Sequence, residues 1–157
     1  MKNFFEIFSL PQIFAIDISE LEKKYLDFQR EFHPDKSSSD DISKSITVNE
    51  AYKVLSDDFL RACYILQLKG IDILHDEKAV KIDFSTLEEA MEMQEKISEI
   101  SKDEIEPLRK ELNSRVKLLI SEAMQNFDTQ EMAQILIRTK YLKKSLEDLK
   151  IRKQKFN

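Results

Sequence analysis

Apolar residues recur at steps of three and four along most of the chain, which is the spacing of an amphipathic helix. The first such stripe lies in residues 17–32 and consists of Ile18, Leu21, Tyr25, Phe28 and Phe32. Asp17 can cap the helix, with Glu20 completing a capping box, and Ile16 and Leu21 occupy the two positions of a hydrophobic staple. The pattern therefore predicts a helix that begins after Asp17.

A second helix follows after a polar loop. His33-Pro34 ends the first helix, because proline disfavours helical geometry in the residue before it. The loop continues through residues 37–41, and a helix from about Ile42 to Leu55 follows. Its inward residues are Val48, Ala51, Tyr52 and Leu55. Two helices of similar length joined by one polar loop predict an antiparallel hairpin, with residues 33–36 near its tip.

A short third helix should close the N-terminal part. Asp57 can cap it, and Gly70, the single glycine, stands where a helix end favours the left-handed conformation. Residues 71–83 show little periodicity and are predicted to be a connector. The chain is thus expected to comprise an N-terminal domain (1–70), the connector (71–83) and a C-terminal domain (84–157).

The C-terminal domain is predicted to be a bundle of three helices. The first spans about 84–101 and the second about 105–126; the third is capped by Asp128 and Glu131. The second helix's stripe comprises Leu108, Leu112, Val116, Leu119 and Ala123, and the third's comprises Met132, Ile135, Leu136, Leu142, Leu146 and Leu149. Pro107 either sits in the second helix's first turn or kinks it. The fold class is all-α, a helical hairpin plus a three-helix bundle.

The first helix of the bundle has two apolar stripes instead of one. Its core stripe is Ala90, Met93, Ile97 and Ile100. Nearly opposite lie Phe84, Leu87 and Met91, clustered with Glu88, Glu92 and Glu95. A surface helix needs only one apolar stripe. The second stripe can pack against the other bundle helices, pack against the N-terminal domain, or form an exposed apolar and acidic partner site. In the third helix, Ile137 and Tyr141 also point away from the main stripe.

Composition narrows the function. Few breakers (one Gly, three Pro) agree with a helical fold, and the net charge of −5 with interspersed signs lacks the basic footprint of a nucleic-acid binder. No apolar run approaches the length of a membrane span, and the N-terminus predicts no signal peptide. Cys63 is the only cysteine, which favours a reducing cytoplasm. One Cys and two widely spaced His make a structural zinc site implausible, and the same count argues against a self-sufficient iron–sulfur protein; we expect no cofactor.

The loop motif and its surroundings resemble the signature of J-domain proteins. That resemblance rests on His33-Pro34-Asp35, preceded by Tyr25, Phe28, Gln29, Arg30 and Phe32, and followed by Lys36 and the segment 49–55, NEAYKVL. Further segments are similar to one subfamily, the HscB co-chaperones: Phe8-Ser9-Leu10-Pro11, Leu60-Arg61-Ala62, Tyr64-Ile65-Leu66 and Gly70. Members of that subfamily pair a J-domain with a C-terminal three-helix bundle. The resemblance covers almost the whole chain.

The resemblance implies an adaptor with two partners and no catalytic activity of its own. It implies that this chain stimulates ATP hydrolysis by a DnaK/HscA-type chaperone. The residues that would bind the chaperone are His33, Pro34, Asp35, Lys24, Arg30 and Lys36. It also implies that the bundle binds the iron–sulfur scaffold protein IscU through Leu87, Glu88, Met91, Glu92, Glu95 and Tyr141. The family often has Met where this chain has Glu88, and Arg where it has Gln94.

Three other functions remain to be distinguished. They are a J-domain co-chaperone for a different client, an enzyme that uses His33 with nearby carboxylates, and a purely structural helical protein. A pocket around His33 would favour the enzyme, and the C-terminal surface would distinguish among clients.

Overall fold

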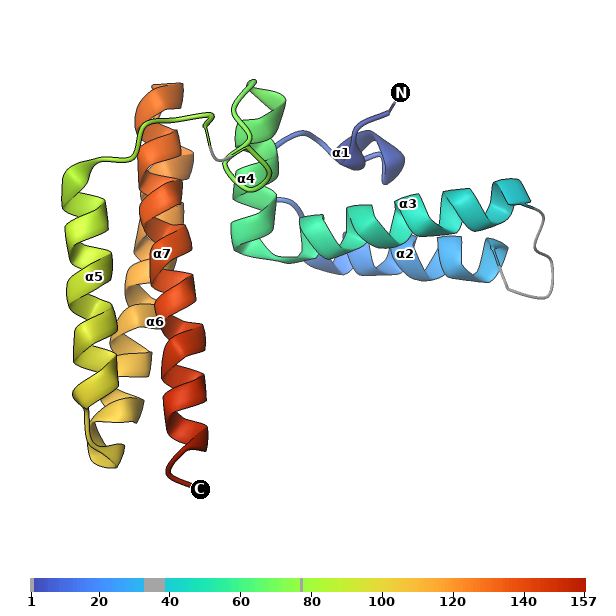
Figure 1. Ribbon diagram of the computed structural model, residues 1–157. Helices are drawn as coiled ribbons and strands as arrows, with labels where there is room; N and C mark the ends of the chain where they lie inside the picture. Colours follow the sequence, from blue (N-terminus) through green and yellow to red (C-terminus); the bar gives the residue numbers. More distant parts are fainter. Residues whose placement is uncertain (1, 33–38, 77) are drawn as a thin grey trace. The chain divides into compact units, whose positions relative to one another are not determined.

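The computed structural model describes residues 2–32, 39–76 and 78–157, and within these ranges the chain is all-helical, as predicted. The helices are α1 (Phe4–Ile7), α2 (Ile18–Glu31), α3 (Ser39–Ser56), α4 (Asp58–Leu68), α5 (Phe84–Glu99), α6 (Lys102–Gln125) and α7 (Thr129–Gln154) (Figure 1). The chain divides into two compact units, Met1–Ile65 and Leu66–Asn157, and each is described by itself.

The start of α2 follows the predicted cap in part. The Glu20 amide donates to Asp17 Oδ1 at 3.2 Å, so Asp17 is the N-cap. The Glu20 side chain does not complete the predicted capping box; its carboxylate instead pairs with Lys24 Nζ at 2.9 Å, one turn along the helix. Ile16 and Leu21, the predicted staple, are both buried in one apolar cluster.

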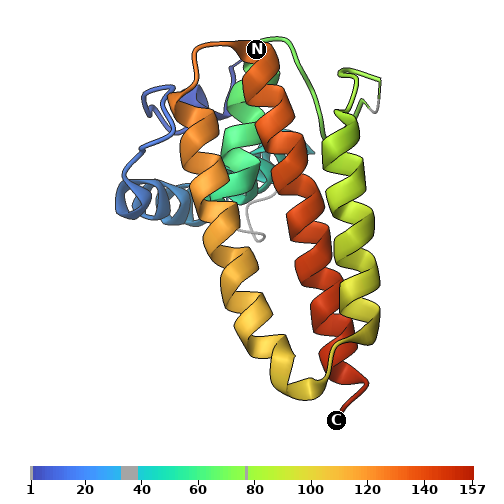
Figure 2. The ribbon, with the colours of Figure 1, turned by 90° about the vertical axis from the view of Figure 1, so that its left-hand side faces the viewer.

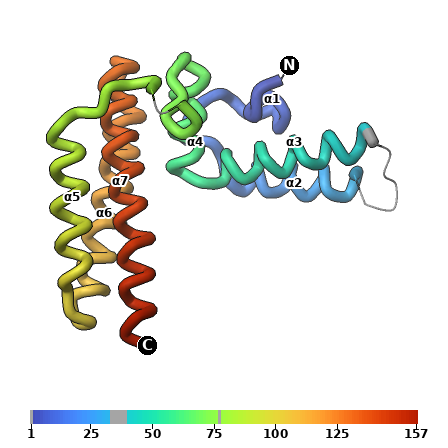
Figure 3. Tube along the Cα trace, viewed as in Figure 1, coloured from blue at the N-terminus to red at the C-terminus, as the bar shows by residue number. Residues whose placement is uncertain are grey.

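Helices α2 and α3 run antiparallel and pack together, which confirms the predicted hairpin (Figure 3). Helix α1 packs against α3, and the shared core contains Phe5, Phe8, Leu21, Val48, Ala51 and Leu55. The rings of Tyr25 and Tyr52 stack across the hairpin with centroids 3.9 Å apart. The Tyr25 hydroxyl also donates to Asn49 Oδ1 at 2.8 Å, so the two helices are joined by apolar and polar contacts.

Helix α4 begins and ends as its sequence predicts. The Leu60 amide donates to Asp57 Oδ1 at 2.8 Å, which satisfies a free N–H group of the first turn. At the other end, Gly70 has φ 103°, and the Ile71 amide bonds the Leu66 carbonyl at 3.2 Å. A residue with a Cβ would be strained at this φ, so the single glycine stands where the helix end requires it.

Arg61, which is only 4% exposed, fastens α4 within the first unit. It donates from Nη1 to the Leu55 carbonyl at 2.7 Å and from Nε to the Phe14 carbonyl at 2.8 Å. Its guanidinium also lies over the Phe14 ring, 4.4 Å from the centroid. These contacts satisfy a buried charge and tie the segment before α2 to the end of α3.

The second unit contains a three-helix bundle in which α7 packs against both α5 and α6 (Figure 2). All of the residues predicted for the α6 core stripe are buried. Helix α6 begins at Lys102, earlier than predicted, because Ser101 and Glu104 form a reciprocal capping box. Pro107 therefore lies beyond the first turn, and the helix continues through it to Gln125.

The segment between α4 and α5 is packed along α7. Lys140 Nζ donates to the Ile73 carbonyl at 3.2 Å, and Ile73 itself is buried. Ile73, Val80 and Ile82 line one pocket of about 530 Å³ together with Ile137 of α7. Ile137, which was expected to point away from the main stripe of α7, lies on a second side of that helix, and this side is also packed. Ile137 is 6% exposed, because this segment covers a second side of α7.

Among the described residues, no helix is both long and apolar enough to cross a bilayer.

Candidate partner-binding surfaces

The predicted chaperone-binding loop falls between helices α2 and α3. His33, Pro34, Asp35 and Lys36 lie outside the described residues. Helix α2 ends at Glu31 and α3 begins at Ser39. The role of these loop residues therefore stays a prediction, as the resemblance implies it.

The two cations predicted to assist that loop differ in their surroundings. The Lys24 side chain is 30% exposed, and its Nζ lies 2.9 Å from Glu20 Oε1 and 3.3 Å from the Ser9 carbonyl oxygen. The Arg30 side chain is 81% exposed, and Asp27 Oδ1, with which it forms an ion pair, is 3.8 Å away from its Nη1. Arg30 is thus available to a partner, whereas Lys24 already has two contacts within its own unit.

The second apolar stripe of α5 is exposed. Phe84 is 78% exposed, Leu87 38% and Met91 71%. On the opposite side of the helix, Ile97 is buried. The hypothesis that the stripe packs against the other bundle helices is therefore wrong. We call Phe84, Leu87 and Met91 the α5 outer strip.

The acidic residues beside the outer strip are also exposed. Glu88, Glu92 and Glu95 face solvent, and no ion pair joins any of them to another described residue. A helix turns about 100° per residue, so Glu88 and Glu95 lie within about 40° of Phe84 around the axis. The α5 outer surface therefore combines large apolar side chains with unneutralised carboxylates, a composition suited to a partner with apolar and basic groups.

Glu89 contrasts with its neighbours, because it points to the other helices. Its carboxylate pairs with Arg115 of α6 and accepts a hydrogen bond from Arg138 Nε of α7 at 2.9 Å. Partial burial alone would raise the pKa of Glu89, but the hydrogen bonds and charges of the two arginines outweigh it and hold the pKa below its ordinary value. No local pattern in the sequence indicates that Glu89 pairs with these two arginines.

Tyr141, the last residue of the predicted client-binding set, lies on α7, whereas the others lie on α5. It is half-buried on α7 and lines the pocket of about 530 Å³ with Ile82, Lys140 and Lys144. Leu87, Glu88, Met91, Glu92 and Glu95 all lie on the exposed side of α5. The structure thus brings together the α5 members of the set and places Tyr141 on a different helix.

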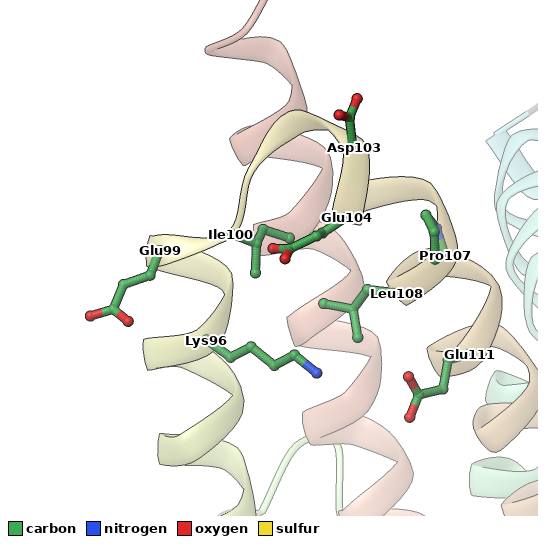
Figure 4. A pocket seen from close by; sticks show the side chains of 8 residues that line it. All are labelled: Lys96, Glu99, Ile100, Asp103, Glu104, Pro107, Leu108 and Glu111. Carbon is green, nitrogen blue, oxygen red and sulfur yellow. The ribbon is translucent and has the colours of Figure 1, made fainter.

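A pocket of about 600 Å³ lies where α5 ends and α6 begins (Figure 4). Ile100 and Leu108 form its apolar part, with Lys96 and several carboxylates around them. These carboxylates do not converge, since Glu99 points away from α6 and Glu104 Oε2 accepts from the Ser101 amide at 3.1 Å. No three His, Cys, Asp or Glu within the described ranges are placed to hold a metal ion. The pocket therefore lacks the grouping that acid–base or metal chemistry needs.

Two family models match the chain, one for each part. Residues 3–64 match the DnaJ domain, and residues 82–150 match the model described as the HSCB C-terminal oligomerisation domain. A co-chaperone protein HscB homolog from Acinetobacter baumannii is 33% identical over 135 residues, which cover 84% of this chain and 77% of the relative. The chain belongs to the HscB family of J-domain co-chaperones.

Other relatives and solved structures agree with this assignment. The HscB homolog of Shewanella amazonensis is 38% identical over 106 residues, 63% of this chain and 60% of the relative. The human co-chaperone HscB structure superposes with a TM-score of 0.85 at 26% identity, covering 98% of this chain and 83% of that one. Chaperone HscB from Vibrio cholerae has the same fold, with a TM-score of 0.79 at 22% identity, over 99% and 100% of the two chains.

Proposed function

We propose that this chain binds an IscU-type iron–sulfur scaffold protein and stimulates the ATPase of a DnaK/HscA-type chaperone. Membership of the HscB family supports a co-chaperone role in iron–sulfur cluster assembly. The observation that carries the proposal further is the exposure of Leu87 and Met91 beside unpaired glutamates on α5. Large apolar side chains that are exposed side by side on one helix face, unlike single exposed ones, mark an interaction surface.

The mechanism is tethering. The bundle holds the scaffold while the His33-Pro34-Asp35 loop binds the chaperone and triggers ATP hydrolysis there. Holding both partners on one chain raises the effective concentration of each at the other. The adaptor itself needs no catalytic group, because the ATPase site belongs to the chaperone. We place this activity in the cytoplasm, in agreement with the single, buried Cys63.

Scaffold binding can be tested with the double variant Leu87→Ala with Met91→Ala. We expect the affinity for purified IscU-type scaffold from the source organism to fall by about 30-fold or more, since truncated anchors contribute about 2 kcal/mol or more. Isothermal titration calorimetry gives the dissociation constant. Leu118→Ala is the matched control. Leu118 is 70% exposed, much like Met91, but it lies on α6 and outside the outer strip, so its truncation should leave binding unchanged. Equal affinity of the double variant and the wild type would contradict the proposal.

Chaperone stimulation is tested separately with His33→Gln. Steady-state ATP hydrolysis by the DnaK/HscA-type chaperone should lose its stimulation, whereas scaffold binding should be retained because the bundle is unchanged. Full stimulation by the variant would overturn the assignment of the loop. Stimulation by the wild type without any scaffold binding would identify a J-domain co-chaperone with a different client.

A further inference from the structure

Phe84 is the largest apolar side chain of the α5 outer strip, and the resemblance to HscB proteins assigns it no role. It is 78% exposed at the first position of α5, and its ring stacks on no other ring in the described part of the chain. Met91 lies seven residues further on, about 20° away around the helix axis, so the two side chains project in nearly the same direction. Phe84 therefore extends the Leu87–Met91 surface towards the start of the helix.

The backbone that carries Phe84 is held in place by α7. Gln134 Nε2 donates to the Lys81 carbonyl at 2.6 Å, and Gln134 Oε1 accepts from the Asp83 amide at 3.4 Å. The nitrogen and the oxygen of one side-chain amide thus both bond the backbone just before α5. An aromatic side chain on a fixed backbone loses little conformational freedom when a partner covers it.

The charge around Phe84 defines the chemistry of that partner. Glu88 follows one turn later, and Glu92 and Glu95 lie further along the same exposed side. None of the three has an ion-pair partner within the described ranges, unlike Glu89. A partner that covers Phe84 and the rest of the outer strip places groups beside these carboxylates, and cationic groups complement them best.

We propose that Phe84 is an anchor of the client interface, received by an apolar pocket of the scaffold protein that is bordered by Lys or Arg side chains. This inference rests on the proposed function, because it names the surface that the client presents to α5. Glu88, where the family often has Met, contributes to the preference for a basic border in this chain.

The test is the affinity of Phe84→Ala for purified IscU-type scaffold, measured beside Phe127→Ala. Phe127 is fully exposed in the turn between α6 and α7, so its variant controls for loss of an exposed aromatic ring. We expect Phe84→Ala to bind about tenfold more weakly or worse, as an aromatic anchor does, and Phe127→Ala to bind as the wild type does. Stimulation of the chaperone's ATPase in the absence of scaffold should be the same for all three proteins.

The basic border is tested by titration at increasing NaCl concentration. Wild-type affinity should fall as salt rises, and it should fall less steeply for Glu88→Gln, since one attraction is removed. Affinity independent of salt would overturn the basic border. Wild-type affinity in Phe84→Ala, with weak binding by Leu87→Ala with Met91→Ala, would overturn this inference and leave the proposed function standing. No binding by the wild type would overturn both.

Discussion

The two units use their aromatic residues in opposite ways. In Met1–Ile65, Phe5, Phe8 and Phe59 are buried, and Tyr25 and Tyr52 stack across the hairpin. In the described residues of Leu66–Asn157 no aromatic side chain is buried, and Phe84 and Phe127 are among the most exposed apolar residues. The bundle core is aliphatic instead, with Leu112, Leu136 and Leu149 almost fully enclosed.

This difference separates apolar residues that stabilise the protein from those that are free to bind. A small hairpin has little interior, so large rings fill it efficiently. A longer bundle fills its seam with aliphatic residues at helical spacing, and an exposed ring on it contributes little to folding. The exposed apolar residues of α5 are therefore better explained by a partner than by the core.

The largest effect should come from the aromatic core of the first unit. Phe5→Ala removes a side chain with 0% exposure, and we expect the free energy of unfolding of that unit to fall by about 3–5 kcal/mol. Urea unfolding followed by near-ultraviolet circular dichroism reports on it, since Tyr25, Tyr52 and Tyr64 belong to this unit. Phe127→Ala should leave the transition unchanged. A loss below about 1 kcal/mol for Phe5→Ala would remove the contrast between the units.

An intermediate effect is expected at Glu89, the α5 carboxylate that pairs with arginines of α6 and α7. Glu89→Gln should lower the free energy of unfolding of the bundle by about 1–2 kcal/mol at neutral pH, a value reduced because water screens the 43% exposed Arg138. Glu88→Gln is the matched control and should have almost no effect. Urea unfolding followed by far-ultraviolet circular dichroism measures both variants.

The stability difference between the wild type and Glu89→Gln should also depend on pH, in a direction that the pKa of Glu89 fixes. The pKa of Glu89 is lowered in the folded protein, so its contribution is present above the ordinary glutamate value of about 4.3 and is lost as the pH falls through the folded pKa. The stability difference between wild type and Glu89→Gln should therefore be constant near neutral pH and shrink in acid. A difference that grows on acidification would show that the arginine contacts do not stabilise the charged form.

The smallest effect on stability should come from the α5 outer strip itself. Leu87→Ala with Met91→Ala should change the free energy of unfolding by about 1 kcal/mol or less, because Met91 is mostly exposed and Leu87 is only partly covered. Leu112→Ala, a truncation in the α6 core at 0% exposure, should lower it by about 2–5 kcal/mol. Similar losses for the two would mean that the strip is part of the bundle core.

Much of the fold follows from local sequence signals. Asp17, Asp57 and Asp128 each cap the predicted helix through backbone N–H groups, and Gly70 has the expected positive φ. The predicted capping box of α2 is only half formed, because the Glu20 carboxylate pairs with Lys24 and not with the backbone of the N-cap. Helix α6 starts earlier than its apolar stripe predicts, because Ser101 and Glu104 form a capping box, a local signal that is present in the sequence.

Helical periodicity and capping act between residues a few positions apart, so the sequence alone determined the helices, their inward faces and the second stripe on α5. Which of the inward faces meets which is a matter of long-range packing. Only the tertiary structure therefore decided that the Phe84 stripe is open to solvent, that Ile137 is covered by the segment before α5, and that Glu89 is joined to Arg115 and Arg138. The physical reason is that these outcomes depend on residues far apart in the chain, whose distance no periodicity encodes.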